Sequence, residues 1–172
     1  MHEMVPALVK GVLTPVDKLE VHQRGLRHKA VSVFVLRAGQ VLIQRRALGK
    51  YHTPGLWANT CCTHPRWGEA DDACALRRLA EELGITGLQL EPAGQVEYRA
   101  DVGAGLVEHE VVALFRAEAG PDLAITLNPE EVMATRWVGV GALRAEIAAT
   151  PEAFTPWLRI YLAEHVGQIF GG

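Results

Sequence analysis

The chain has 172 residues, of which 49% are hydrophobic and 22% are charged. Length and composition are those of one average globular domain and exclude a disordered, collagen-like or disulfide-rich chain. The net charge of −3 gives no sign of a nucleic-acid or anionic-membrane partner. Three cysteines, an odd number, and an N-terminal segment without a long apolar run favour a reducing, cytoplasmic setting without a membrane span. We therefore expect one domain over residues 1–172 and no obligate protein partner.

The first part of the chain is expected to hold strands and one long loop. Within residues 1–30 we expect an N-terminal strand followed by a basic segment that carries histidines. The β-branched runs at 31–37 and 41–45, on either side of a turn at 38–40, predict a β-hairpin. Residues 49–68 are rich in Pro and Gly and predict a long loop, which in a compact domain is commonly functional.

The rest of the chain begins with a predicted helix over residues 69–83, ended by Gly84. Its apolar face is expected to consist of residues at helical spacing: Ala73, Leu76, Leu79 with Ala80, and Leu83. Strands are then predicted at 94–100, 106–117 and 136–138, and helices at 140–149 and 156–170. Because strands and helices mix without strict alternation, we expect an α+β fold with a mixed sheet between helices.

Five residues of the types that ligate transition metals lie in three of these segments: His22, His28, His64, Glu108 and Glu110. Side chains two apart on a strand share a face, with Cα atoms roughly 6.6 Å apart, so both glutamates can face one ion while His109 faces away. Leu106 and Val112 are in phase with the glutamates, so this face is expected to be partly buried. Two buried carboxylates need a cation, and the ligand types predict a divalent ion such as Zn²⁺ or Mn²⁺.

Two adjacent cysteines follow in the predicted loop. Because neighbouring side chains in an extended segment point in opposite directions, at most one of Cys61 and Cys62 is expected to enter a given pocket as a nucleophile or base. Cys74, on the predicted helix, is interpreted as a small buried hydrophobe.

The predicted helix also carries the i,i+4 pairs Arg77/Glu81 and Arg78/Glu82. They are typical of surface ion pairs worth a few tenths of a kcal/mol, but beside a ligand-rich loop they equally suit a magnesium and phosphate site. Further cations would complete a pocket for a diphosphate: Lys18, Arg46 and Lys50.

Residues 69–85 resemble a Nudix box, with Glu69, Arg77, Glu81, Glu82 and Gly84 in register. Thr63 stands where the box has Gly, and Arg78 replaces a glutamate with which Nudix hydrolases hold metals. The wider chain resembles type I isopentenyl-diphosphate Δ-isomerases of the Nudix superfamily. The matching segments follow the family's order: 18–22, 45–50, 54–65, 68–69, 77–78, 81–84, 98–100, 107–110 and 154–157.

The resemblance implies a Nudix-like fold and the reversible isomerisation of isopentenyl to dimethylallyl diphosphate through a tertiary carbocation, supplying isoprenoid biosynthesis. The resemblance implies that Cys62 and Glu110 are catalytic, together with Tyr98, and that the five residues named above bind Mn²⁺ or Zn²⁺. It implies that Glu82 holds Mg²⁺ with the substrate and that Cys62 also contacts a metal ion. It implies diphosphate contacts by Lys18, Arg46, Lys50 and Arg78, and stabilisation of the carbocation by Trp157. Cys61 is implied to be a spectator.

One departure and two rival functions accompany this resemblance. Thr63 stands where the family has Gly after the cysteine. Because a threonine side chain is strained at positive φ, this replacement requires that the backbone at Thr63 does not have a positive φ. The rivals are a Nudix pyrophosphohydrolase acting on a nucleoside diphosphate derivative and a catalytically silent metal-binding module.

Overall fold

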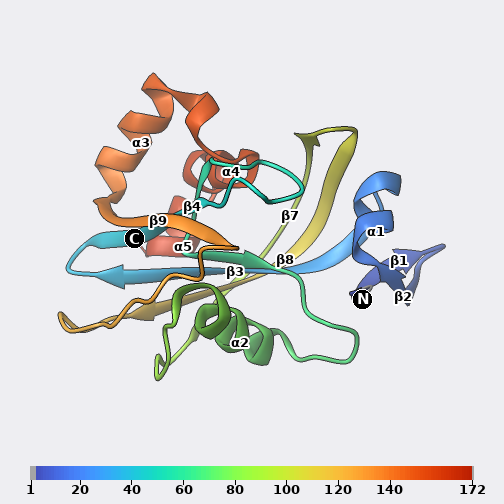
Figure 1. Cartoon of the computed structure of the whole chain (residues 1–172), viewed down its shortest axis with the longest axis horizontal. Helices are drawn as coiled ribbons and strands as arrows, with labels where there is room; N and C mark the ends of the chain where they lie inside the picture. The colour runs from blue at the N-terminus through green and yellow to red at the C-terminus, as the bar shows by residue number, and fades with distance from the viewer. Residues whose placement is uncertain (1–2, 172) are drawn as a thin grey trace.

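A mixed β-sheet forms the middle layer of the molecule, with helices on both of its faces (Figure 1). The computed structural model describes residues 3–171. The strands are β1 (Met4–Val9), β2 (Val12–Asp17), β3 (Arg27–Arg37), β4 (Gln40–Arg46), β5 (Trp57–Ala58), β6 (Cys61–Thr63), β7 (Glu91–Gly103), β8 (Leu106–Glu118) and β9 (Val132–Gly139). The helices are α1 (Lys18–Arg24), α2 (Asp71–Leu83), α3 (Val140–Ala149), α4 (Pro156–Glu164) and α5 (Val166–Phe170), with a 3₁₀ turn at Pro151–Ala153. The predicted α+β class is confirmed.

Strand β3 is the centre of the sheet. It pairs in parallel with β8 along one side and antiparallel with β1, β6 and β4 along the other. Four residues of β3 are fully buried: Val31, Val33, Phe34 and Val35. Ala30 is almost fully buried. A strand covered on both faces reads as a continuous apolar run, which explains the sequence of β3.

Two apolar cores lie on opposite faces of the sheet. One packs α3, α4 and α5 against residues such as Phe34, Val112 and Leu114. The other packs α2 against residues such as Val33 and Leu42. Because successive side chains of a strand alternate between faces, each sheet residue belongs to the α2 side or to the α4 side.

Helix α2 differs from the prediction at its start and in its buried face. It begins at Asp71, and Glu69 lies before it. Ala73, Leu76 and Ala80 are exposed, whereas the buried stripe is formed by Cys74, Ala75, Leu79, Glu82 and Leu83. The buried face is therefore rotated from the expected one and includes the charged residue Glu82.

The predicted end of α2 is confirmed. Gly84 has φ +61°, and a Cβ there would lie 2.9 Å from the backbone oxygen of Thr126, so the position requires glycine.

The N-terminal part contains more structure than predicted, because β1 and β2 form a hairpin and α1 follows directly (Figure 1). Asp17 caps α1 by accepting hydrogen bonds from the backbone N–H groups of Leu19 and Glu20. The hairpin predicted over 31–45 is confirmed as β3 and β4, but β3 starts at Arg27 and therefore includes His28.

Later elements also differ in length. The predicted loop at 49–68 contains the short strands β5 and β6, and β7, β8 and β9 extend beyond the predicted strands. The helix predicted over 156–170 is divided into α4 and α5 at His165, whose φ of −128° is not helical. None of the described helices combines the length and apolarity needed to cross a membrane.

Candidate active site and metal centre

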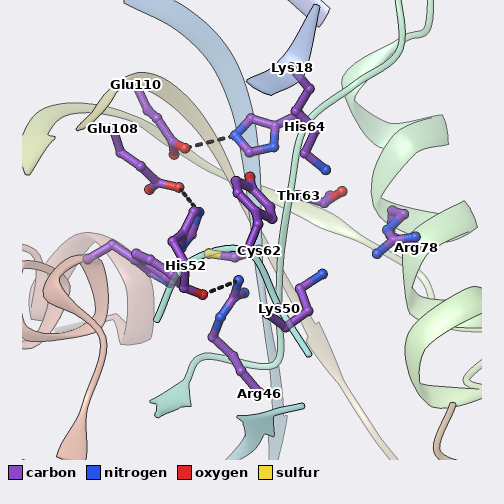
Figure 2. Close-up of a pocket in the computed structure, with 12 residues that line it drawn as sticks. Lys18, Arg46, Lys50, His52, Cys62, Thr63, His64, Arg78, Glu108 and Glu110 are labelled. Carbon is purple, nitrogen blue, oxygen red and sulfur yellow. Dashed lines mark hydrogen bonds and ion pairs between the residues drawn. The ribbon is translucent and has the colours of Figure 1, made fainter. Parts of the chain in front are cut away.

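One cavity gathers most of the residues singled out from the sequence (Figure 2). From that set it is lined by Lys18, Arg46, Lys50, Cys62, Thr63, His64, Arg78, Glu108, Glu110 and Trp157. Tyr51 and His52, which were not singled out, also line it. The lining side chains come from α1, β4, β6, α2, β8, α4 and the segments after β4 and β6, so the cavity depends on the whole fold.

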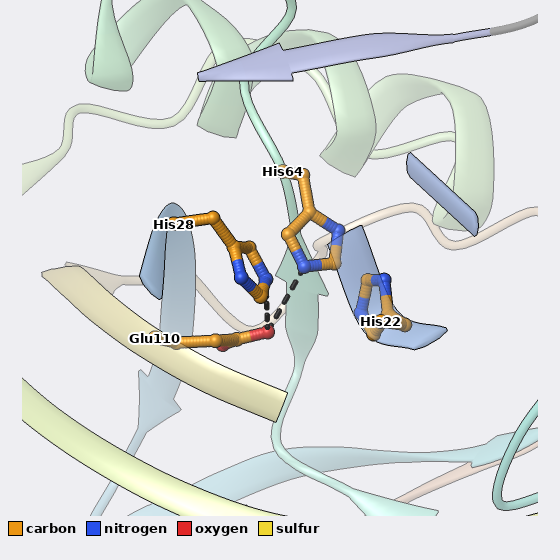
Figure 3. Close-up of side chains that lie close together, drawn as sticks. All are labelled: His22, His28, His64 and Glu110. Carbon is orange, nitrogen blue, oxygen red and sulfur yellow. Dashed lines mark hydrogen bonds and ion pairs between the residues drawn. The ribbon is translucent and has the colours of Figure 1, made fainter. Parts of the chain in front are cut away.

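Four buried side chains form a compact cluster, shown in Figure 3: His22, His28, His64 and Glu110. Each offers one ligand atom, and these atoms all lie within 4.8 Å of one another. His64 Nε2 is 2.9 Å and His28 Nε2 is 3.4 Å from Glu110 Oε1. Sheet register places His28 and Tyr98 opposite Glu110 on the two neighbouring strands, while α1 supplies His22.

Two imidazole rings of this cluster, those of His22 and His28, are oriented as in metal-binding histidines. Nδ1 of His22 lies 2.7 Å from the carbonyl oxygen of Lys18, and Nδ1 of His28 lies 2.7 Å from that of Leu26. A ring that donates from Nδ1 keeps the Nε2 lone pair for an ion. In the described part of the chain, His28 Nε2 and His64 Nδ1 are buried without a hydrogen-bond partner. Because buried polar atoms are normally partnered, a divalent ion fits this donor set.

Glu108 belongs to a second group, formed with His22 and His52. Its Oε1 lies 2.9 Å from His52 Nε2 and 3.4 Å from His22 Nε2. The Tyr98 hydroxyl lies 2.8 Å from Glu108 Oε2 and 2.9 Å from Glu110 Oε2, so it joins the two carboxylates. As predicted, both glutamates are buried on one face, whereas His109 points to the other, where Nε2 lies 3.6 Å from Glu97.

The electrostatics keep the two carboxylates charged and favour the neutral form of two of the imidazoles. Burial opposes ionisation of Glu108 and Glu110, but the neighbouring histidines, together with Tyr98 at Glu110, hold the pKa of both carboxyls below the usual value. Burial lowers the pKa of His52, and lowers that of His64 much further. His28 differs: burial also opposes its charged form, but Glu110, the Leu26 carbonyl and Glu108 together outweigh burial and raise the pKa of His28.

Strand β6 sends its two cysteines to opposite faces of the sheet. Cys61 is fully buried on the α2 side, where its thiol donates to Glu82 Oε2 at 3.1 Å. Cys62 faces the cavity, with Sγ 2.9 Å from Ser32 Oγ and 3.1 Å from Asn59 Oδ1. Burial raises the pKa of the Cys62 thiol well above its ordinary value, so the thiol is protonated at neutral pH.

Thr63 follows Cys62 in the same strand and pairs with Val31. Its backbone is therefore extended, and the requirement for a φ that is not positive is met.

Four cations line the same cavity: Lys18, Arg46, Lys50 and Arg78. Burial lowers the pKa of Lys18, and the neighbouring Lys50 and Arg78 lower it further. Glu131 accepts a hydrogen bond from Lys50 and lies 3.4 Å from Arg78. Cations crowded together in a partly buried cavity favour an anion with several negative oxygens, such as a diphosphate.

The acidic residues of α2 lie apart from the histidine cluster. Arg78 Nη2 lies 3.1 Å from Glu82 Oε1, and its Nη1 lies 2.7 Å from Glu81 Oε2. Gln44 and Cys61 donate to the other oxygen of Glu82. Among the described residues, Glu82 and Cys62 belong to neither metal-ligand group, so their metal contacts stay predictions.

Sequence reasoning missed several residues that line the cavity or form bonds with the side chains around it. His52 lies two residues after Lys50, so a search for histidines near the predicted cations would have found it. Ser32 and Tyr161 are joined by a 2.9 Å hydrogen bond across 129 residues of chain, and no local pattern indicates that contact. Apart from its charge, nothing in the sequence around Glu131 indicates that it contacts Lys50 and Arg78.

The fold and the α2 motif define the class of protein. The family model for the NUDIX domain matches residues 26–158, so the chain carries a NUDIX domain. Solved structures agree on the fold. A protein from Deinococcus radiodurans superposes with a TM-score of 0.75 at 17% identity, over 94% of this chain and 98% of that one. A MutT NUDIX hydrolase from Burkholderia pseudomallei gives a TM-score of 0.62 at 22% identity, over 81% and 98%.

Comparison with curated relatives identifies the family within the NUDIX class to which the chain belongs. The chain is 69% identical over 171 residues to an isopentenyl-diphosphate Delta-isomerase of Cereibacter sphaeroides, covering 99% of this chain and 97% of that protein. It is 64% identical to the protein of that name from Dinoroseobacter shibae, with the same coverage, and 62% identical to that from Rhodobacter capsulatus, over 98% and 96%. The chain therefore belongs to the isopentenyl-diphosphate Delta-isomerase family.

Proposed function

We propose that the chain catalyses the reversible isomerisation of isopentenyl diphosphate to dimethylallyl diphosphate. The observation that carries this proposal is the position of two proton-transfer groups. Cys62 on β6 and Glu110 on β8 flank β3 on its two sides, point to the same face of the sheet and line one cavity. The cavity also contains the cations that suit a diphosphate.

The reaction needs two proton transfers and no other reactant. A proton added to the terminal carbon of the double bond leaves a tertiary carbocation. Loss of a proton from the carbon on the other side of the cationic centre forms the new double bond. Two groups positioned across a flat substrate meet this need, and because the reaction is reversible, each donates in one direction and accepts in the other. We assign these roles to Cys62 and Glu110.

Tyr98 and the histidine cluster position Glu110 in this proposal. The Tyr98 hydroxyl and His64 Nε2 each lie 2.9 Å from a different oxygen of Glu110. We propose that the cluster binds Mn²⁺ or Zn²⁺ through the three histidines and two glutamates, and that Glu82 and Cys62 contribute to an Mg²⁺ site with the substrate. When bound, a divalent ion at Glu110 supplies positive charge that makes a proton on this carboxyl more acidic.

Trp157 is proposed to stabilise the carbocation. Its side chain is 1% exposed, lines the cavity and packs edge-on against the His52 ring at 5.7 Å. A cation over a desolvated indole gains about 2 kcal/mol. The guanidinium of Arg46, 5.3 Å from the same ring, would link this wall to the diphosphate.

The alternative function, hydrolysis of a nucleoside diphosphate derivative, is disfavoured by Arg78. Its guanidinium binds Glu81 and Glu82, the carboxylates with which a Nudix box would hold metal ions. Arg78 also stands where the box has a further glutamate, so this chain has one metal-holding carboxylate fewer than a Nudix hydrolase.

The test is incubation of the purified chain with isopentenyl diphosphate in D₂O with Mg²⁺, followed by NMR. We expect dimethylallyl diphosphate that carries deuterium in a methyl group, without release of phosphate. Phosphate or pyrophosphate release from nucleoside diphosphate derivatives, without isomerisation, would support the hydrolase. No turnover of either substrate would support a silent metal-binding module.

The cellular setting stays a prediction. The three cysteines are unpaired, which suits the cytoplasm, and the small diphosphate substrate would place the chain in isoprenoid biosynthesis. A single domain, and the lack of nucleic-acid, membrane and obligate protein partners, also stay predictions.

A further inference from the structure

His52 is a buried side chain of the cavity with no part in the proposed proton transfers. It is 4% exposed and contacts three parts of the site. Its carbonyl oxygen accepts from Arg46 at 3.2 Å, its ring packs against Trp157, and its Nε2 lies 2.9 Å from Glu108 Oε1. A residue in that place connects the diphosphate end of the cavity with the metal centre.

Thr53 holds the ring of His52 from the other side. Its Oγ1 lies 2.9 Å from His52 Nδ1. Thr53 has φ +46°, a left-handed conformation that is strained for a β-branched residue. Residues with strained backbone conformations are more frequent at functional sites than elsewhere. A hydroxyl that donates to Nδ1 fixes the imidazole tautomer with its proton on Nε2, the atom that faces Glu108.

Direct coordination by His52 agrees less well with the geometry. His52 groups with His22 and Glu108, whereas the larger cluster groups His22 with His28, His64 and Glu110. The two groups share His22, and the single Nε2 lone pair of a neutral imidazole binds one ion. Two ions would therefore compete for His22, while a hydrogen bond from His52 to Glu108 requires no second ion.

We propose that His52 is a positioning residue of the metal centre, oriented by Thr53 and donating from Nε2 to Glu108. Glu108 is then held at both oxygens, by His52 at Oε1 and by Tyr98 at Oε2. This inference rests on the proposed function of the cluster as a divalent-metal site. Partners that orient a metal ligand typically change metal affinity by about 10–100-fold when removed.

The test measures Mn²⁺ binding by electron paramagnetic resonance in matched variants. Thr53→Val removes the hydroxyl but keeps the β-branched shape, and Thr53→Ser keeps the hydroxyl. We expect Mn²⁺ to bind about tenfold or more weakly to His52→Ala and several-fold more weakly to Thr53→Val, with Thr53→Ser close to wild type. His52→Gln, whose amide can donate to Glu108, is expected to recover part of the affinity. Thermal melting without metal checks the fold, and if His52→Ala does not fold, the Thr53 pair decides.

Two results would overturn the inference while leaving the metal centre intact. One is equal Mn²⁺ affinity in Thr53→Val and Thr53→Ser. The other is two ions per wild-type chain that fall to one in His52→Ala, which would make His52 a ligand. The proposed centre is tested separately by His28→Ala, which is expected to lose the ion. If the wild-type chain does not bind Mn²⁺, both the proposed metal centre and the proposed role of His52 are wrong.

Discussion

The ion pair between Glu69 and Arg77 fastens the segment between β6 and α2 to the helix that follows it. Arg77 donates to both oxygens of Glu69, from Nε at 2.7 Å and from Nη2 at 2.8 Å, and the Arg66 backbone N–H donates at 3.0 Å. These hydrogen bonds lower the pKa of Glu69 from 4.5 to about 2. That difference corresponds to about 3 kcal/mol. Because both side chains remain partly exposed, at 16% and 18%, solvent screening reduces the expected contribution to about 1–2 kcal/mol.

We predict that Glu69→Gln lowers the free energy of unfolding by about 1–2 kcal/mol at pH 7. A carboxyl with a depressed folded-state pKa stabilises the fold fully above its unfolded pKa and loses that contribution as the pH falls through the folded pKa. The difference between wild type and variant should therefore shrink between pH 4.5 and about 2.

Urea unfolding at several pH values measures both effects, with Glu81→Gln as the control. Glu81 also accepts from Arg77, but its side chain is 39% exposed, so a loss of about 0.5 kcal/mol or less is expected. Equal losses in the two variants, or a Glu69→Gln loss that does not change with pH, would show that the Glu69–Arg77 ion pair does not stabilise the fold in this way.

Three further predictions concern the site and its support. Tyr98→Phe removes the hydroxyl that joins Glu108 and Glu110, and should lower kcat about a hundredfold in steady-state assays; a change in KM alone would contradict the positioning role. Gly84→Ala places a Cβ 2.9 Å from Thr126 at positive φ, and should destabilise the fold by about 1–3 kcal/mol; unchanged urea unfolding would count against this. Chelation should abolish isomerisation, and added divalent metal should restore it; full activity after verified metal removal would exclude the proposed role of the ion.

Regular alternation made part of the site predictable from sequence. The two-residue period of a strand places Glu108 and Glu110 on one face and His109 on the other, and it separates Cys61 from Cys62. These features depend on local geometry that tertiary packing did not override. The end of α2 at Gly84 was predictable for the same reason.

Features that depend on long-range packing were not predictable. The buried face of α2 was misjudged because Glu82 points inward, and its burial requires Cys61, Gln44 and Arg78 from three different elements. The position of His52 depends on a left-handed backbone conformation at Thr53. Because β-branched residues rarely adopt this conformation, the sequence did not predict it.

The N-terminal hairpin was missed for a different reason. Pro6 and Pro15 lie opposite each other in β1 and β2. Proline weakens the sequence signal of a strand and is tolerated at the edge of a sheet, where β2 lies with β1 next to it.

The fold presents one of two adjacent cysteines, Cys62, to the cavity that also contains Glu110, and we propose that Cys62 acts on the substrate there. The most direct measurement compares isomerisation of isopentenyl diphosphate by wild type, Cys62→Ser and Cys61→Ser, with the fold of each checked by thermal melting. We predict that Cys62→Ser loses at least about a hundredfold in kcat, while Cys61→Ser, whose hydroxyl can still donate to Glu82, keeps most of it. Equal losses in both variants, or turnover that survives in Cys62→Ser, would contradict the claim.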